Sequence, residues 1–179
     1  MKGMPRLLSS LALVLALCPW LFAAGELSNR PAPEFRLQDA KGSTVSLADY
    51  KGKVILIEFM STTCPHCQKL APALEAVHAK FKGRVGVLGI ATHTDNASTV
   101  TEFAQTYKVS YPILLDPTHS TALGYLKPAP PNYSFSIPHL FVVDQSGYIR
   151  DDFTENPSNS EFFTAEGLSR LVGAYLARR

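Results

Sequence analysis

Residues 54–70 read VILIEFMSTTCPHCQKL. The first part, residues 54–59, is a nearly continuous apolar run, which is typical of a strand that is buried on both faces. CPHC follows at residues 64–67, directly before a segment whose apolar positions fall at helical spacing: Leu70, Leu74, Val77 and Phe81. A CxxC motif between a buried strand and the start of a helix indicates redox chemistry.

The helix is expected to run from Pro65 to about Phe81, because proline is favoured in a first helical turn. A helix N-terminus carries partial positive charge and free N–H groups, which favour a thiolate at Cys64. We therefore expect Cys64 to be the nucleophile and Cys67, one turn further in, to resolve the mixed disulfide, so that the two form a redox disulfide. His66 adds a donor or a positive charge beside Cys64, and Pro65 and His66 are expected to tune the redox potential.

Strands and helices alternate along the rest of the chain. The sequence predicts a hairpin over residues 35–47, strands at 85–91 and 113–115, helices at 98–107 and 120–125, strands at 140–143 and 148–150, and a helix at 164–177. This order is typical of an α/β domain with a mixed sheet and helices on both faces. We expect one domain over residues 35–179, preceded by a proline-containing linker at residues 26–34.

Composition excludes several classes of protein. The 179 residues are 46% hydrophobic and 18% charged, with a net charge of +2, which argues against a disordered chain and against an electrostatic nucleic-acid binder. No acidic residue precedes Glu26, whereas Lys2 and Arg6 do. The net charge therefore belongs to the first 25 residues, and the remainder is formally neutral.

The start of the chain predicts export. A basic beginning, a short apolar centre and small residues before a cleavage point after Gly25 indicate a secretory signal at residues 1–25, and hence a periplasmic or other extracytoplasmic location. Two alternatives would anchor the protein to a membrane: an uncleaved signal, or lipidation of Cys18. Where the signal is removed, Cys64 and Cys67 remain in an oxidising compartment, and their loop is too short for a useful structural bridge.

A set of short motifs surrounds the CPHC sequence: FRLQD (35–39), Gly42, VSL (45–47), KGK (51–53), the strand ending Glu58-Phe59, and Ile137-Pro138 followed by FVVD (141–144) and Gly147. Together they resemble the TlpA/ResA branch of the thioredoxin-like proteins over roughly residues 31–177. The resemblance implies a three-layer thioredoxin-like fold with a mixed central sheet, an N-terminal β-hairpin and a central helix–strand insertion.

The resemblance also implies roles for residues outside the motif. Pro138 is expected to be cis and to lie against the CxxC, where the backbone of Ile137 would pair with an extended substrate. Glu58 stands where thioredoxins have a buried acid that moves protons to or from Cys67; the alternative is a carboxyl at the strand edge facing solvent. The implied partners are protein thiols or disulfides and a membrane redox partner, with a role in cytochrome c maturation and without a cofactor or nucleic acid.

Two signals disagree about redox direction. CPHC resembles the DsbA oxidants, whereas the surrounding scaffold resembles the TlpA/ResA reductases. The sequence also departs from the family pattern, because Thr62-Thr63 stands where a Trp is common and His139 stands where many members have Thr. We therefore predict an exported thiol-disulfide oxidoreductase and leave its direction open.

Four histidines give an alternative of another class. His66, His93, His119 and His139 all lie next to predicted strands, at one edge of the sheet, where ligands bind in open parallel sheets. With Cys64 and Cys67, one or two of them would suit copper or zinc, as in a metal-binding or metal-delivery protein. No closely spaced second ligand pair supports this alternative, so it ranks below disulfide exchange and no metal is expected.

A peroxide-reducing site is also disfavoured. Peroxiredoxins need Thr or Ser three residues before the reactive cysteine and Pro four residues before that. Ser61 satisfies the first requirement, but Ile57 occupies the proline position.

Overall fold

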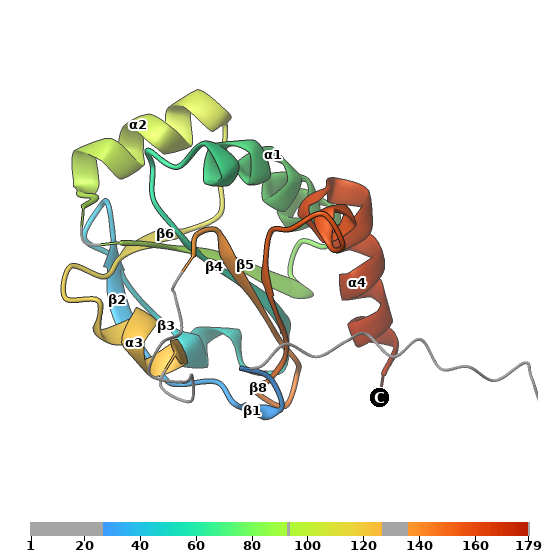
Figure 1. The fold of residues 1–179 in the computed structure, drawn as a ribbon. Helices are drawn as coiled ribbons and strands as arrows, with labels where there is room; N and C mark the ends of the chain where they lie inside the picture. The colour runs from blue at the N-terminus through green and yellow to red at the C-terminus, as the bar shows by residue number, and fades with distance from the viewer. Residues whose placement is uncertain (1–26, 93, 127–135, 179) are drawn as a thin grey trace, which may run out of the picture.

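The computed structural model describes residues 27–92, 94–126 and 136–178. In these ranges the chain forms one eight-stranded mixed sheet with helices on both faces (Figure 1). The strands are β1 (Arg30–Pro31), β2 (Arg36–Asp39), β3 (Thr44–Ser46), β4 (Val54–Met60), β5 (Val85–Ala91), β6 (Ile113–Leu115), β7 (His139–Val143) and β8 (Tyr148–Thr154). The helices are η1 (Leu47–Tyr50), α1 (Pro65–Lys80), α2 (Ala97–Tyr107), α3 (Ser120–Leu126), η2 (Ser160–Phe163) and α4 (Ala165–Ala177). The predicted signal segment, Cys18 and His93 lie outside the described residues.

Strand β4 is at the centre of the sheet. It runs parallel to β5 and antiparallel to β7, and all seven of its residues are buried. The strand order is β1-β8-β7-β4-β5-β6-β2-β3, with the predicted hairpin β2–β3 at one edge. Helix α2 and strand β6 stand between β5 and β7 in the chain and form the expected helix–strand insertion.

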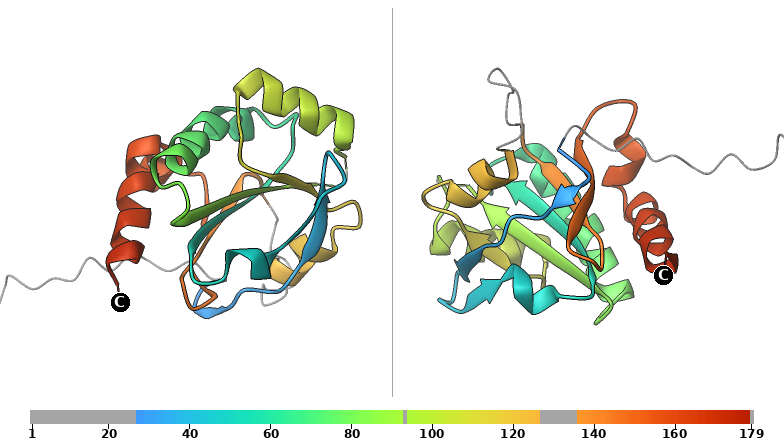
Figure 2. Two further views of the ribbon diagram at one scale, coloured as in Figure 1. Left: turned by 180° about the vertical axis from the view of Figure 1, so that it is seen from behind. Right: turned by 90° about the horizontal axis from the view of Figure 1, so that it is seen from below.

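The helices divide unequally between the two faces. Helices α1, α2 and α4 cover one face, and α3, η1 and the segment before β2 cover the other (Figure 2). Side chains alternate along a strand, so Val54 and Leu56 pack towards α1 whereas Ile55 and Ile57 pack on the opposite face. The same alternation directs Glu58 towards α1.

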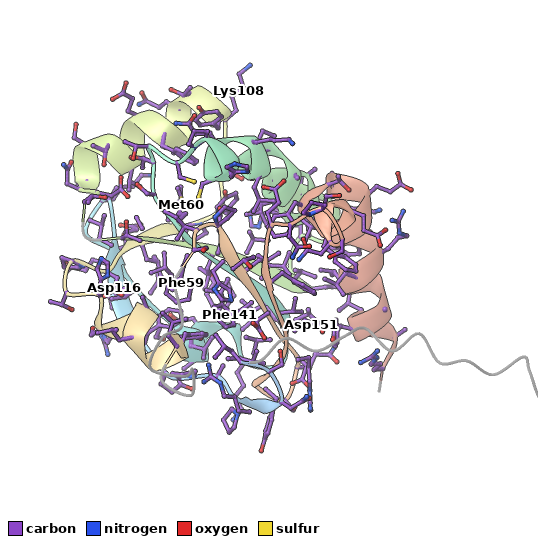
Figure 3. All side chains as sticks on the ribbon, in the orientation of Figure 1. Phe59, Met60, Lys108, Asp116, Phe141 and Asp151 are labelled. Atoms are coloured by element: carbon purple, nitrogen blue, oxygen red, sulfur yellow. The ribbon has the colours of Figure 1, made fainter. Side chains whose placement is uncertain are left out.

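Three aromatic rings fill the core on the α3 face. Phe59 of β4, Phe141 of β7 and Tyr125 of α3 contact one another with centroid distances of 5.1 to 5.7 Å; the two phenylalanines are labelled in Figure 3. Such tilted and edge-to-face pairs add to the stabilisation from burial. They help to hold the C-terminal end of β4 beside the N-terminal end of β7, and the CxxC follows this end of β4.

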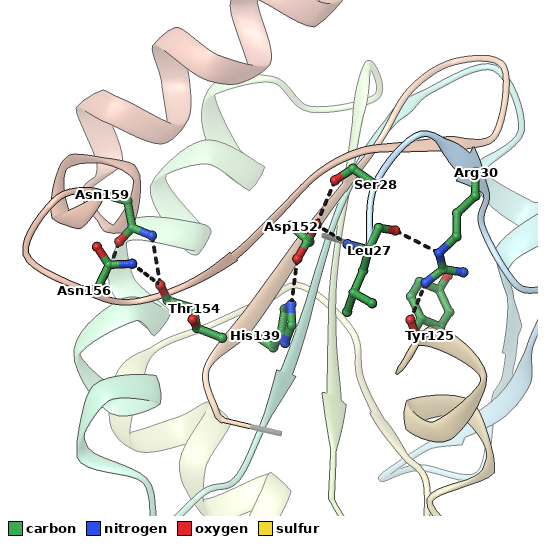
Figure 4. Close-up of polar contacts among 9 residues, drawn as sticks. All are labelled: Leu27, Ser28, Arg30, Tyr125, His139, Asp152, Thr154, Asn156 and Asn159. Atoms are coloured by element: carbon green, nitrogen blue, oxygen red, sulfur yellow. Dashed lines mark hydrogen bonds and ion pairs between the residues drawn. The ribbon is translucent and has the colours of Figure 1, made fainter. Parts of the chain in front are cut away.

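The segment expected to be a linker is instead part of the domain. β1 pairs with β8, and Leu27 is only 1% exposed. The N–H of Leu27 and the hydroxyl of Ser28 both donate to Oδ1 of Asp152, at 3.0 and 2.8 Å (Figure 4). The prolines of this segment suggested a linker, but a proline is tolerated in an edge strand such as β1.

Strand β8 is longer than its sequence suggests. It was expected to end at Arg150 and continues to Thr154, because two acidic side chains find distant partners. The hydroxyl of Tyr175 in α4 donates to Asp151, and His139 lies 3.5 Å from Asp152 on the other face.

No helix in the described part of the chain has the length and apolar character needed to cross a bilayer.

Candidate functional site

The CPHC motif occupies the junction between β4 and α1. Cys64 is the N-cap of α1 with extended backbone angles, and Pro65 is the first helical residue. Cys64 is partly exposed, whereas Cys67 is fully buried under the first turn; both carry free thiols. The pair therefore has one sulfur that a partner can reach and one that it cannot.

The Ile137–Pro138 segment lies against the outer cysteine. Its peptide bond is cis, the conformation that the resemblance implies. The Cys64 thiol donates to the carbonyl oxygen of Ile137 at 3.7 Å, and Ile137 packs on the same core cluster as α1. The described structure thus brings Cys64, Ile137 and Pro138 together at one end of the sheet.

Glu58 lies behind the inner cysteine and is completely buried. Neither of its carboxyl oxygens accepts a hydrogen bond from a nitrogen or oxygen donor among the described residues, and the thiol of Cys67 is the polar group in contact with it. Burial raises the pKa of Glu58 to about 8, although the Cys67 contact opposes the shift. Burial, and next the charge of Glu58, raise the pKa of Cys67. The charge of Glu58 disfavours ionisation of Cys67, whereas the Cys67 contact favours the ionised carboxyl, so a proton can pass from the thiol to the carboxylate.

His66 points away from the core. Its ring is 66% exposed, and Nδ1 lies 2.8 Å from a carboxyl oxygen of Glu155, in the loop after β8. His66 therefore makes a polar contact with Glu155, whereas the thiol of Cys64 makes one with the carbonyl oxygen of Ile137. A histidine in CPHC would add positive charge beside Cys64, and the carboxylate of Glu155 offsets that charge.

An acidic side chain at the start of the insertion holds the loop before Cys64. The backbone N–H of Thr62 donates to Oδ1 of Asp95 at 3.2 Å, and the hydroxyl of Thr62 also donates to that oxygen. Gln68 of α1 donates to the carbonyl oxygen of Thr62 at 2.8 Å. These contacts fix a loop in which Thr62-Thr63 replaces the more usual aromatic residue.

The histidine after Pro138 does not join the thiols. His139 is fully buried on the face opposite α1, where its ring stacks on Phe141 with a centroid distance of 4.4 Å and lies 3.5 Å from Asp152 (Figure 4). In addition, the described residues contain no group of three or more His, Cys, Asp or Glu side chains that could hold a metal ion. His139 therefore does not lie beside the thiols as one of the one or two histidines in the metal alternative.

Three residues of this region escaped the sequence analysis. Asp95, Glu155 and the buried Tyr111 lie in loops, far along the chain from the residues they contact. Asp95 precedes Asn96, whose side chain caps α2, so the pattern DNAST signalled a helix start. It did not signal the contact with Thr62.

Comparison with known proteins gives consistent results. Residues 28–152 match the AhpC/TSA family. The thioredoxin-like protein YneN of Bacillus subtilis is 29% identical over 130 residues, which cover 71% of each chain. The thiol-disulfide oxidoreductase ResA of the same organism is 31% identical over 119 residues, which cover 66% of this chain and 62% of ResA. The chain thus spans less than two thirds of that ResA.

Solved structures share the fold. A thiol:disulfide interchange protein of the thioredoxin family from Chlorobium tepidum superposes with a TM-score of 0.71 at 23% identity, over 83% of this chain and 97% of that one. A secreted disulfide oxidoreductase of Mycobacterium tuberculosis, described as homologous to E. coli DsbE, gives a TM-score of 0.63 at 22% identity, over 78% and 95% of the two chains. The predicted thioredoxin-like α/β fold is confirmed.

Proposed function

The chain belongs to the AhpC/TSA family, and from that premise we propose that it is a thiol-disulfide oxidoreductase that exchanges disulfides with proteins through Cys64 and Cys67. The observation that carries the proposal is the unequal pair of thiols: Cys64 is reachable at a helix N-terminus, whereas Cys67 is buried against Glu58. Relatives that are named thiol-disulfide oxidoreductases support it.

The exchange has two steps. The thiolate of Cys64 attacks one sulfur of the partner disulfide, which forms a mixed disulfide and releases one partner thiolate. Cys67 then loses its proton to Glu58, and its sulfur attacks Sγ of Cys64. A Cys64–Cys67 disulfide forms, the second partner thiolate leaves, and two electrons pass from the dithiol to the partner. The reverse sequence oxidises a partner dithiol.

The cis segment supplies a place for the partner chain. Ile137 and Pro138 lie beside Cys64, where an extended segment of a partner would bring its sulfur to Cys64. Backbone pairing of this kind is independent of sequence, as in other modes of strand addition. It suits an enzyme whose partners are protein thiols or disulfides, and the cytochrome c maturation role of the resembling family is one such case.

Insulin reduction tests the proposal. With dithiothreitol as electron donor, the wild-type protein should accelerate insulin precipitation, and Cys64→Ser should abolish the acceleration because the attacking thiolate is lost. Lys82→Gln, a change at an exposed side chain outside the motif, is the control and should stay active. Full activity in Cys64→Ser would reject the mechanism.

The reduction potential of the Cys64–Cys67 pair assigns the direction. A value near that of thioredoxin, about −270 mV, would make the protein a reductant, and one near that of DsbA, about −120 mV, an oxidant. The resemblance of the scaffold to the TlpA/ResA proteins favours a reductant, whereas the resemblance of CPHC to the DsbA motif favours an oxidant. The pairing of His66 with Glu155 at 2.8 Å supports a potential below that of DsbA, because it offsets a charge that would stabilise the Cys64 thiolate.

We propose also that the protein is exported, which its basic and apolar first 25 residues support. One solved relative is described as secreted. Fractionation of cells that produce the full chain, followed by intact-mass measurement, distinguishes the three forms. A mass that begins after Gly25 supports cleavage, a full-length membrane-bound chain supports an anchor, and a lipid adduct on Cys18 supports lipidation.

A further inference from the structure

The carboxylate of Asp152 joins two segments that are far apart in the chain. Asp152 belongs to β8 and is buried. Its Oδ1 accepts hydrogen bonds from the N–H of Leu27 and the hydroxyl of Ser28, at 3.0 and 2.8 Å, and its Oδ2 lies 3.5 Å from Nε2 of His139 (Figure 4). One oxygen thus holds the start of the domain, and the other faces the residue that follows Pro138.

His139 stands at the boundary between the sheet and the partner-binding segment, by which we mean Ile137 and Pro138. Strand β7 begins at His139, whose backbone pairs with Phe59 of β4 and Thr154 of β8. The partner-binding segment therefore lies just outside the ladder, where it contacts the outer thiol. A contact that holds His139 in place also determines where this segment leaves the sheet.

The ring of His139 is held from two sides on the face opposite the thiols. It stacks on Phe141 with a centroid distance of 4.4 Å and an angle of 5° between the planes, and the carboxylate of Asp152 lies at its Nε2. Both polar groups are buried. A buried pair of this kind adds little net stability, because the cost of removing both groups from water offsets their attraction. It does fix the orientation of both groups.

Residues 27–32, which we call the N-terminal strap, make a second contact on the other side of the partner-binding segment. Nη2 of Arg30 donates to the carbonyl oxygen of Tyr125, and Nε of Arg30 donates to that of Leu27 at 2.8 Å (Figure 4). Tyr125 lies near the end of α3, the helix that precedes Pro138 in the chain. The strap thus contacts residues that come before the segment and a residue that comes after it.

The strap is also bonded to the sheet through its own backbone. Its central strand β1 pairs with β8. The N–H of Asn29 donates to the carbonyl oxygen of Ile149 at 2.8 Å, and the N–H of Ala32 donates to that of Gly147 at 2.9 Å. These bonds do not involve Asp152, so loss of that carboxylate should leave β1 in place.

We propose that the N-terminal strap positions the partner-binding segment, through the contact of Asp152 with His139 on one side and the contact of Arg30 with the end of α3 on the other. The inference rests on the proposed function and adds the residues that control partner binding in it. An extended partner chain must meet a fixed segment, whereas a small disulfide needs only the sulfur of Cys64. Asp152 and Arg30 are therefore positioning residues for protein partners, and the sulfur chemistry itself does not depend on them.

Asp152→Ala tests the inference, because it removes the link between the strap and His139. The rate of mixed-disulfide formation is measured in the Cys67→Ser background, where the mixed disulfide accumulates, with a disulfide-bonded peptide and with the small disulfide dithiobis(nitrobenzoate). We expect attack on the peptide to slow about ten-fold, because the partner chain no longer meets a fixed segment, and attack on the small disulfide to be unchanged. Asp152→Asn, whose amide keeps the size and hydrogen-bonding capacity of the side chain, should recover most of the rate.

Asp151→Ala is the matched control. Asp151 is the neighbouring buried acid of β8, and it accepts a hydrogen bond from the hydroxyl of Tyr175 on the opposite face. Its loss should lower the free energy of unfolding but leave the ratio of the two exchange rates unchanged. Equal slowing with both disulfides in Asp152→Ala, or the same selective slowing in Asp151→Ala, would overturn the inference.

Arg30→Met tests the second contact and carries the test alone where Asp152→Ala does not fold. It removes the guanidinium group but keeps an apolar stem, and it should also slow attack on the peptide selectively. A ratio of the two rates equal to that of the Cys67→Ser parent would contradict the inference. If the parent itself forms no mixed disulfide with the peptide, the proposed function fails instead, and the two failures are thereby distinguished.

Discussion

Burial determines the protonation state of Glu58. The carboxyl group stands in a strand whose seven side chains are all buried, and its pKa rises from an ordinary 4.5 to about 8 because charge is poorly solvated there. A neutral carboxyl beside Cys67 can donate a proton, and after deprotonation it can accept one. This residue therefore links the chemistry of the site to the stability of the domain.

Glu58→Gln should flatten the pH dependence of stability. In the reduced wild-type protein, the stability contribution of Glu58 is fully present below pH 4.5 and is lost as pH rises through 8, because the unfolded chain ionises first. The slope from this group is up to about 1.4 kcal/mol per pH unit. Urea unfolding at pH 5 to 8 measures it. The exposed control Glu102→Gln should keep the wild-type slope, and a Glu58→Gln slope equal to wild type would contradict the burial argument.

At the start of α2, two adjacent residues serve different elements. Asn96 caps the helix by accepting hydrogen bonds from the N–H groups of Ser98 and Thr99, at 2.9 and 3.2 Å. Asp95 accepts from Thr62 in the loop before the CxxC. The insertion thus holds the active-site loop through Asp95, while Asn96 stabilises only its own helix.

These two positions form a matched pair of variants. Asn96→Ala should cost about 1 kcal/mol of unfolding free energy and leave the exchange rate unchanged. Asp95→Ala should cost a similar amount and also slow attack by Cys64, because the Thr62 amide loses its acceptor and the loop loosens. Urea unfolding and the single-turnover rate of mixed-disulfide formation measure the two effects. An equal rate in both variants would show that the Asp95 contact does not position the loop.

Local sequence patterns predicted most helices and strands. They did not predict the polar contacts between residues that lie far apart in the sequence. The apolar run of β4, the helical spacing in α1 and the turn at Gly147 all follow from neighbours in the sequence. The contacts of Thr62 with Asp95 and of His66 with Glu155 join residues 33 and 89 positions apart. Polar residues in loops carry no periodic signal, so no pattern indicated these partners.

At the scale of the whole molecule, the two faces of the sheet have separate tasks. The α1 face holds the thiols, Glu58 and Tyr111, whereas the opposite face holds His139 and Asp152 and fixes the chain before β2 (Figure 4). Hydrogen bonds from His139, Ser28 and Leu27 outweigh the effect of burial and lower the pKa of Asp152. That carboxylate therefore stabilises the domain above its ordinary pKa, and the stabilisation is lost as pH falls through its lowered value.

The sequence could not show this division. A histidine directly after Pro138 suggested a ligand beside the thiols, but strand alternation directs His139 to the other face. The register of β7 against β4 decides which face a residue occupies, and that register depends on the whole sheet. Residues 27–34 are likewise held by distant contacts, because β1 pairs with β8 and Leu27 and Ser28 donate to Asp152, although their prolines suggested a linker.

Trapping of the mixed disulfide tests the central claim most directly. Reduced Cys67→Ser is mixed with a disulfide-bonded peptide, and the intact mass and the modified residue are determined. The account predicts one peptide chain attached through Cys64, removable by dithiothreitol, and no such adduct on Cys64→Ser, whose remaining Cys67 is buried. An adduct that forms on Cys67 as fast as on Cys64, or no adduct in Cys67→Ser, would contradict the account.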